Sequence, residues 1–443
     1  MHTFLANAQQ KFTRGAAILS VTSFASYFLG LVRDRLFAHT FGASAELDTY
    51  NAAFIVPDLL LNILVAGALQ AAFLPLFNAI LKNKGKTSAQ EFASSVLNIA
   101  LLVVFVAALL AVIFMPLLAP LIAPGFSPEQ RATLINLSRI LLLSPLIFAA
   151  SNTLGTLLIS AKNYTAYGLS PVFYNFGIIA GTFWLVPHFG IYGVALGTLA
   201  GALLHLAIRI IGFHGLALRL KPLIHVRIPE MKRLLVLMLP KMVGHPVEQL
   251  SFWAFTSIAS GLAAGSITII SFARNFMSVP VSLFGIAFAT AVFPLLSDAA
   301  LTGKSADFLS QLRNSLKKIL LFTVPSAAFL VIFGYYVVKI LLGSGAFDDN
   351  DVRLTAGVLS IFALSIPLES ISHLLARAFY ALQNTLLPVI FSLASLVVAI
   401  GAAALLAPRF GITMVAWAFL LGSLTKLLLL AIFLPRTMAA QRS

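Results

Sequence analysis

The sequence predicts an all-α polytopic membrane protein, with about twelve transmembrane helices in two six-helix pseudo-symmetric lobes around a central cavity. Three observations lead to this fold class. Of the 443 residues, 60% are hydrophobic and only 10% are charged, with a mean hydropathy of +0.99, whereas about a quarter of the residues of a soluble domain are charged. Apolar runs long enough to cross a membrane recur along the whole chain. A segment from the middle of the chain also returns near its end.

The apolar runs define the expected helices. In the first half they cover 15–37, 52–81, 92–120, 132–160, 167–187 and 191–217. In the second half they cover 231–261, 266–297, 308–342, 352–382, 385–407 and 412–435. The first run is too long for the core of a cleaved signal peptide, so we expect it to remain as a membrane helix.

The repeat divides these helices into two halves. The segment Pro187–Ile191 (PHFGI) returns as Pro408–Ile412 (PRFGI), an offset of 221 residues, which also pairs Gly201 with Gly422. We therefore expect an N-terminal lobe at 1–222 and a C-terminal lobe at 223–443. Because each lobe has an even number of helices, the two share one topology, which is the layout of an alternating-access transporter.

Loop charges predict the orientation and the surroundings. Lysine and arginine gather in alternate loops, as at Lys82, Lys84, Lys86 and in the segment 219–233. Positive loops stay in the cytoplasm, so both termini are expected there and the basic loops should contact anionic phospholipid. The net charge of +15 therefore does not indicate nucleic acid. Cysteine is absent, which excludes disulfides and thiolate metal sites.

Polar residues inside apolar spans are the candidate functional residues, because charges at membrane depth are costly and usually face a partner, a cavity or a substrate. Asp58 and Asn62 share a helix face, as do Glu369, His373 and Arg377. The candidates for substrate binding are Arg33, Asp34, Asp48, Asp58, Asn62, Arg274 and Arg377. The candidates for coupling or for lining the cavity are Lys241, His245, Glu248, Glu369 and His373.

Structural roles are open for the same residues. Arg33 and Arg35 are placed where a long side chain can reach the membrane interface. The Lys241–Glu248 and Glu369–Arg377 stripes are also suited to internal ion pairs that fix helix packing. Asp48 is also suited to begin or cap the second helix.

Catalytic motifs are missing from the sequence. It contains no HExxH, no glycine-rich phosphate loop with its lysine and no Gly-x-Ser-x-Gly. We therefore expect no enzyme, no cofactor and no metal site. Without an ATP-binding loop, transport would be driven by the membrane potential or by a proton or sodium gradient.

Several segments together resemble a known family. They are Gly30–Asp34 (GLVRD), Phe41–Ala43, Asp48 with Pro57, Ala72–Pro75 (AFLP), Ala123–Phe126 (APGF), Asn163 through Pro171 to Asn175, and Phe293–Leu295 (FPL). This set resembles the MurJ/MviN lipid II flippases, members of the multidrug/oligosaccharidyl-lipid/polysaccharide exporter superfamily. The resemblance implies a bacterial cytoplasmic (inner) membrane protein, active in peptidoglycan biosynthesis and hence in cell shape, with other cell-wall synthesis proteins as further partners. Arg33, Asp34 and Asp48 match family positions directly.

The sequence also departs from that family. Further cavity arginines of the family's first two helices fall on Tyr27 and Leu61, and a lysine of its tenth helix falls on His373. Its eighth-helix Asp-Arg pair falls on Arg274 and Asn275. The family typically has two more helices than the twelve expected here.

The leading hypothesis is a flippase that moves undecaprenyl-diphosphate-linked peptidoglycan precursor (lipid II) across the membrane by alternating access. A cationic cavity suits the diphosphate, while the prenyl tail stays in lipid. The first alternative is a cation-coupled exporter of drugs, metabolites or another lipid-linked glycan within the same superfamily. An alternative of another class is a non-transporting membrane scaffold whose deep charges are all paired internally.

Overall fold

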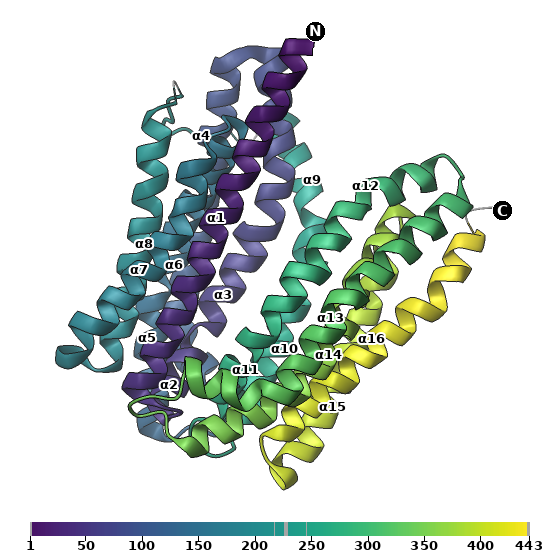
Figure 1. Cartoon of the computed structure of the whole chain (residues 1–443). Helices are drawn as coiled ribbons and strands as arrows, with labels where there is room; N and C mark the ends of the chain where they lie inside the picture. The colour runs from purple at the N-terminus through teal and green to yellow at the C-terminus, as the bar shows by residue number, and fades with distance from the viewer. Residues whose placement is uncertain (1, 217, 226–228, 245, 441–443) are drawn as a thin grey trace. The chain divides into compact units, whose positions relative to one another are not determined.

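The computed structural model describes residues 2–216, 218–225, 229–244 and 246–440. Within these ranges the chain forms sixteen α-helices and two short π-helical segments, and it contains no strand (Figure 1). The all-α fold class predicted from the sequence is confirmed.

The helices follow the predicted spans closely. In the first half they are α1 (His2–Phe41), α2 (Ala45–Ala53), α3 (Ile55–Leu61), η1 (Asn62–Ala66), α4 (Gly67–Ile122), α5 (Pro128–Leu141), α6 (Leu143–Ser160), α7 (Tyr164–Phe189) and α8 (Ile191–His214). In the second half they are α9 (Pro229–Gly244), α10 (Pro246–Ala259), α11 (Ser266–Pro280), η2 (Val281–Ile286), α12 (Ala287–Leu301), α13 (Ser305–Leu341), α14 (Asp349–Ala381), α15 (Leu386–Phe410) and α16 (Thr413–Ala440). In the part of the chain that the structure describes, each of the twelve predicted spans is mainly helical.

Long apolar helices make this a multi-pass membrane protein. Among the described residues, nine helices are long and apolar enough to cross a membrane. One of the nine, Ala72–Ile122, lies in α4 and joins the end of the predicted span 52–81 to the predicted span 92–120. Gly85, between them, has non-helical dihedrals of φ 83° and ψ −180°. The rings of Phe73 and Phe92 lie 5.6 Å apart, although a straight helix would separate these positions by about 28 Å. The chain therefore folds back at Gly85.

Contacts divide the chain into two groups of residues. Unit 1 contains 1–37, 52–121 and 127–249, and unit 2 contains 38–51, 122–126 and 250–443. Each unit therefore includes helices from the predicted lobe of the same half, with short segments exchanged. The predicted lobe boundary at 222/223 stays a prediction.

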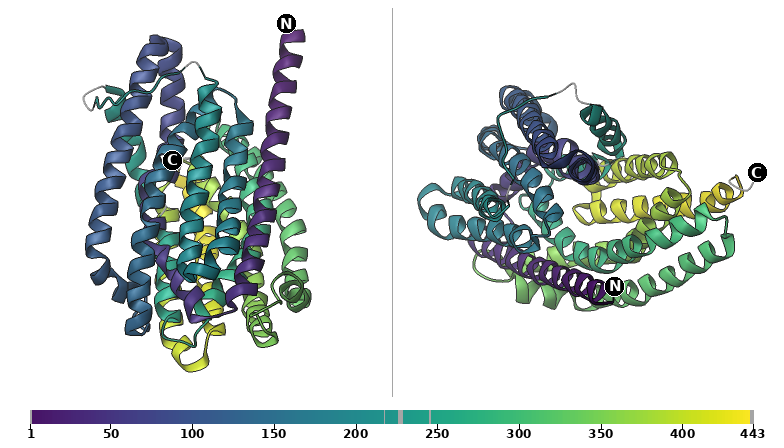
Figure 2. Two further views of the ribbon diagram at one scale, coloured as in Figure 1. Left: turned by 90° about the vertical axis from the view of Figure 1, so that its left-hand side faces the viewer. Right: turned by 90° about the horizontal axis from the view of Figure 1, so that it is seen from above.

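In unit 1, α7 and α8 pack closely against each other. The helices of that unit (purple, blue and teal) run alongside one another in Figure 2. A Cβ atom on Gly181 would lie 2.2 Å from the Cα of Gly197, and one on Gly177 would lie 2.3 Å from the Cα of Gly201. Glycine on both helices therefore brings the two backbones together, as the spacing of Gly193, Gly197 and Gly201 predicts.

Unit 2 is organised around α14, which packs against α11, α12, α13 and α16. Its hydrophobic core includes the fully buried Phe308 and Phe379. The last pair of helices, α15 and α16, is joined at Gly411 with φ 84°, just as α7 and α8 are joined at Gly190 with φ 55°. Glycine suits both turns because other residues rarely adopt positive φ. The sequence repeat is therefore also a repeat of backbone conformation.

Candidate functional site

The centre of the candidate site in unit 1 is Arg33, on α1. Its Nε and Nη2 donate hydrogen bonds to Oδ1 of the neighbouring Asp34 at 3.0 and 2.8 Å. Its Nη1 donates to Oδ1 of Asn175 at 3.2 Å. The side chain of Asp34 is 9% exposed, while that of Arg33 is 24% exposed. The guanidinium group is therefore fixed on two sides and still partly accessible.

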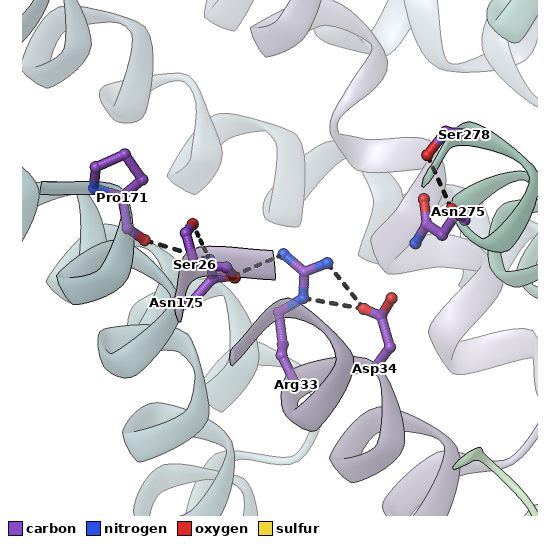
Figure 3. A network of polar contacts seen from close by, with 7 residues as sticks. All are labelled: Ser26, Arg33, Asp34, Pro171, Asn175, Asn275 and Ser278. Atoms are coloured by element: carbon purple, nitrogen blue, oxygen red, sulfur yellow. Dashed lines mark hydrogen bonds and ion pairs between the residues drawn. The ribbon is translucent and has the colours of Figure 1, made fainter. Parts of the chain in front are cut away.

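Asn175, on α7, holds this guanidinium from a second helix (Figure 3). Its Nδ2 donates to the backbone and side-chain oxygens of Ser26 at 3.3 Å each, and to the backbone oxygen of Pro171 at 3.2 Å. The amide is buried, with 7% of the residue exposed. Because both ends of the amide are engaged, its orientation is set, and Oδ1 faces Arg33.

Small residues let α1 and α7 come close enough for these bonds. A Cβ atom on Gly168 of α7 would lie 2.2 Å from Oγ1 of Thr22 on α1. Likewise, a Cβ atom on Gly15 of α1 would lie 2.6 Å from the ring of Tyr164 at the start of α7. The two helices therefore touch over several turns, and Arg33 extends from the same face.

Asp48 belongs to unit 2, where it binds the start of α11. Its carboxylate accepts hydrogen bonds from the backbone amide of Gly265 at 2.8 Å and from the amide and hydroxyl of Thr268 at 2.7 Å each. Burial raises the pKa of Asp48 to about 6, although these hydrogen bonds oppose the rise. Asp48 thus lies in the first turn of α2 and caps a different helix, α11.

Asp58 and Asn62 lie where α3 passes into the π-helical segment η1 in unit 1. Nδ2 of Asn62 donates to the backbone oxygen of Asp58 at 2.9 Å, so the two residues share a face as the spacing predicts. Both are partly buried. A π-helical turn often marks a functional position in a longer helix.

In unit 2 the two candidate arginines stack on aromatic rings. Arg274 is exposed and its guanidinium lies 4.5 Å from the ring centre of Phe252. Arg377 is partly buried, 5.6 Å from Phe293 and 5.9 Å from Tyr380. Cation–π contact holds a guanidinium group in place over an aromatic ring.

The coupling candidates divide into two groups. Glu369 on α14 lies 3.5 Å from the ammonium group of Lys426 on α16, measured from Oε2 to Nζ, and it also interacts with His373. His245 lies outside the described residues, and so do the side chains of Lys241 and Glu248. The stripe containing these three residues stays a prediction.

Four polar residues were not among the candidates drawn from the sequence. Asn175 was noted only within the family resemblance, and Lys426 was not noted at all. The other two, His205 and Arg209, are spaced i, i+4 in α8 and are both buried. That spacing in an apolar helix was the signal that could have identified them.

Arg209 is bonded to neutral groups from two helices. Its Nη1 donates to the backbone oxygen of Ser151 at 2.7 Å and to Oδ1 of Asn152 at 2.9 Å, and its Nε donates to Oγ of Ser170 at 3.2 Å. Ring Nδ1 of His205 is hydrogen-bonded to Oγ of Ser151 at 2.8 Å. This cluster ties α6, α7 and α8 together.

The chemistry of these residues fits an anion better than a metal ion. Among the described residues, no group of three or more histidine, cysteine, aspartate or glutamate side chains could hold a metal. Arg33 instead presents a planar cation whose N–H groups match the geometry of phosphate.

The family model described as "Lipid II flippase MurJ" matches residues 37–443. The chain belongs to this family. The match begins just after Arg33 and Asp34, so the placement of these two residues rests on the structure and on the sequence pattern. The family assignment predicted from the sequence is confirmed.

Individual relatives agree with the family model. The lipid II flippase MurJ of Burkholderia cenocepacia is 27% identical over 392 residues, which cover 86% of this chain and 76% of that protein. A solved structure titled "Lipid II flippase MurJ, inward closed conformation" matches with a TM-score of 0.81 and 26% identity, covering 96% of this chain and 90% of that one. A structure described as the inward-facing conformation of a multidrug resistance MATE transporter of the MOP superfamily has a TM-score of 0.79, covers 97% of this chain and 99% of that one, and shares the fold at 15% identity.

Proposed function

We propose that this protein flips undecaprenyl-diphosphate-linked peptidoglycan precursor, lipid II, across the cytoplasmic membrane by alternating access. The observation that carries the proposal is the family match over residues 37–443. The relative from Burkholderia cenocepacia bears the name of that activity. A solved structure with that name has the same fold over nearly the whole chain.

The chemistry of unit 1 supports the same substrate. A diphosphate needs a cation that is held in a fixed direction, and Arg33 is held by Asp34 and Asn175. Asp34 neutralises part of its charge, so the anion is bound weakly enough to be released. We propose that Asp58 and Asn62 of the same unit help to shape this site. We also propose that Asp48, Arg274 and Arg377, which belong to unit 2, take part in binding the substrate. The prenyl chain requires only an apolar surface.

We extend the proposal to the membrane and the orientation. The protein lies in the bacterial inner membrane with both termini in the cytoplasm, and its lobes at 1–222 and 223–443 alternate the access of the substrate. The distribution of lysine and arginine among the loops supports this orientation. Other cell-wall synthesis proteins are expected to supply and consume the substrate.

Anionic phospholipid is the second proposed partner. A cavity of about 510 Å³ in unit 1 is lined by Lys86, His214 and Arg219 together with Leu216 and Leu218. These residues belong to loops or helix ends on the expected cytoplasmic side. Such a mixture of cations and leucine suits a lipid phosphate with its first carbon atoms.

The proposal can be tested by expressing this protein, and two of its arginine variants, in cells from which the native flippase has been depleted. Cells that lose their own flippase should regain lipid II in the outer leaflet when they express this protein. Arg33→Ala should abolish the rescue at normal protein levels, whereas Arg35→Ala should preserve it, because Arg35 is exposed on the same helix. Failure of the wild-type protein to restore outer-leaflet lipid II would reject the substrate.

The same assay distinguishes the alternatives. The MATE-like fold makes export of an organic cation the second candidate. Reconstituted protein would then transport a cationic dye when an ion gradient is applied, and it would not move lipid II. A scaffold would move neither substrate.

A further inference from the structure

A small cavity in unit 1 lies between α4, close to its fold at Gly85, and the first turns of α9. Its volume is about 220 Å³, whereas pockets for drug-sized ligands measure about 300–1,000 Å³. Two apolar and four polar side chains are among those that line it: Leu76, Ile80, Asn83, Lys84, Glu230 and Arg233. The cavity therefore has room for one small polar group with an apolar neighbour, and not for a whole lipid.

The hydrophobic core of unit 1 holds the two walls of this cavity together. Leu76 and Ile80 of α4 and Met231 and Leu234 of α9 are buried in the same hydrophobic cluster. On α9, Met231 and Leu234 each follow directly after a charged residue that lines the cavity. Because the core fixes both helices, the cavity has its shape before a ligand binds.

The polar rim of the cavity lies where the lipid-facing surface of these helices begins. On α9, Leu235, Val236 and Leu237 are exposed and directly follow Arg233. On α4, Leu81 is exposed just before the lysine-rich segment. In a multi-pass membrane protein, exposed apolar side chains in such runs face lipid chains. The cavity is thus placed at the level of the lipid head groups.

The acid in the cavity is ionised and can accept a further donor. Nζ of Lys84 donates a hydrogen bond to Oε1 of Glu230, and this bond holds the pKa of Glu230 below its ordinary value. The side chain of Glu230 is 19% exposed and that of Lys84 is 56% exposed. An ionised carboxylate has about four sites that accept hydrogen bonds, so Lys84 leaves others available.

The remaining polar groups suit a phosphate. Arg233 is exposed, and a planar guanidinium group can bind two oxygens of one phosphate. The amide of Asn83 adds further N–H donors. The acid sets this cavity apart from the cavity of about 510 Å³, whose described polar lining residues are Lys86, His214 and Arg219, all basic. The two cavities therefore suit different head groups.

The spacing of the opposite charges narrows the choice of head group. Glu230 and Arg233 are spaced i, i+3 on α9, so their Cβ atoms are about 5–6 Å apart on one face. In an ethanolamine head group only two carbon atoms separate the ammonium group from a phosphate oxygen. A head group of this size can contact both side chains of α9 at once.

We propose that this cavity binds the head group of a zwitterionic phospholipid that ends in a primary ammonium group, as phosphatidylethanolamine does. The phosphate accepts hydrogen bonds from Arg233 and Asn83, and the ammonium group donates to Glu230. The first carbon atoms of the acyl chains contact Leu76 and Ile80. A choline head group has no N–H to donate, and an anionic lipid brings no cation to Glu230. This binding is independent of what the protein transports.

Photocrosslinking of the full-length protein in detergent tests the site. A phosphatidylethanolamine with a photoreactive group at its glycerol should label segments 76–84 and 229–237. Unlabelled phosphatidylethanolamine should compete about three- to ten-fold better than phosphatidylcholine with the same acyl chains, because choline loses a hydrogen bond to a partly exposed charge. Equal competition by the two lipids, or stronger competition by phosphatidylglycerol, would overturn the proposal.

A pair of variants separates lipid binding from a structural role of the ion pair. Glu230→Gln removes the charge that the ammonium group needs, so the preference for phosphatidylethanolamine over phosphatidylcholine should fall toward one. Lys84→Gln breaks the same ion pair but keeps the carboxylate, so the preference should persist or increase. Equal changes in both variants would show that the pair only holds α4 and α9 together, and would reject the lipid site.

Two further variants control for the phosphate and for charge in general. Arg233→Gln should weaken competition by both lipids to a similar extent, because both contain the phosphate. Glu91→Gln removes an exposed acid of α4 that does not line the cavity, and it should behave as wild type. Loss of the preference in Glu91→Gln would mean that the general surface charge, and not Glu230, selects the lipid.

A soluble head group distinguishes a lipid from a free solute. Glycerophosphoethanolamine carries the same phosphate and ammonium groups without acyl chains, so it cannot contact Leu76 and Ile80 in the same way. It should compete with the photoreactive lipid far more weakly than phosphatidylethanolamine does. Equal competition at equal concentration would show that the cavity binds a soluble zwitterion, and the lipid would be rejected as its occupant.

Discussion

Asn175 on α7 accepts a hydrogen bond from Nη1 of Arg33 on α1 at 3.2 Å, although the two residues are 142 positions apart. The same amide donates to Ser26 and to the backbone oxygen of Pro171. Arg33 is thereby held by one residue beside it, Asp34, and by one residue from another helix. The direction of the guanidinium is consequently a property of helix packing as well as of α1.

Replacing the amide of Asn175 should cause a large loss of lipid II flipping but only a small loss of folding stability. Asn175→Ala removes one acceptor of Arg33 and the amide that donates to Ser26 and Pro171, which should lower the free energy of unfolding by about 1–2 kcal/mol. Flipping should fall strongly because Arg33 loses its second anchor. Thermal unfolding of purified protein and a lipid II flipping assay would measure the two effects.

Asn175→Asp is the matched control for this variant. Its carboxylate still accepts from Arg33, but it cannot donate to Ser26 or Pro171. Flipping should then be nearer to wild type than in Asn175→Ala. Equal loss in both variants would show that the amide stabilises helix packing only and does not position Arg33.

Protonation of Asp48 should make stability depend on pH. Its pKa in the folded chain, about 6, is above the ordinary value of 3.8, so folding favours the protonated carboxyl. The contribution of Asp48 to the free energy of unfolding is complete below pH 3.8 and is lost as the pH rises to about 6. The full contribution is about 3 kcal/mol. Asp48→Asn should remove this slope from a series of thermal unfolding measurements.

Glu46→Gln supplies the comparison, because Glu46 is an exposed acid in the same turn of α2. Its stability profile should follow that of wild type across the interval. If Asp48→Asn keeps the wild-type slope, burial of Asp48 does not control the pH dependence.

Periodicity and composition were enough to predict the fold. Runs of apolar residues identify membrane helices because the bilayer requires every backbone group to be bonded within the helix. The PHFGI and PRFGI segments predicted the repeat because they recur at a fixed offset. The structure explains their glycines, since Gly190 and Gly411 each occupy a turn with positive φ. The hairpin inside α4 was also expected, since the lysine-rich segment at 82–86 separates two apolar runs.

Contacts between distant helices were harder to predict. Spacing along one helix identified Asp58 with Asn62 and Glu369 with His373, because residues four apart share a face. It could not identify Asn175 for Arg33 or Lys426 for Glu369, since these partners lie on other helices and their register is set by packing. Asp48 shows the same limit, because its cap is on α11 and not on its own helix.

Contact between α7 and α8 should be sensitive to a single methyl group. A Cβ atom on Gly197 would lie 2.8 Å from the Cα of Gly181, and the contact is with backbone that cannot rotate away. Gly197→Ala should therefore destabilise the protein by about 1–3 kcal/mol, as overpacking does. Thermal unfolding monitored by size-exclusion chromatography would measure the loss.

Gly401→Ala on α15 is the control, because nothing lies within 4 Å of a Cβ atom there. This variant should be as stable as wild type or more stable by up to about 1 kcal/mol, since alanine is the better helix former. Equal destabilisation by Gly197→Ala and Gly401→Ala would mean that helix propensity, and not the close approach of α7 and α8, accounts for the effect.

Arg209 and Gly155 should behave as a coupled pair. A Cβ atom on Gly155 would lie 2.6 Å from Nη1 of Arg209, so Gly155→Ala must displace the guanidinium from Ser151 and Asn152. Arg209→Ala removes the donor to Oδ1 of Asn152 and to the backbone oxygen of Ser151 and should cost about 1–3 kcal/mol. In the double variant the added methyl occupies space that the arginine has left, so the combined loss of stability should be smaller than the sum. A double-mutant cycle of unfolding free energies measures this coupling, and strict additivity would show that the two residues do not share the space.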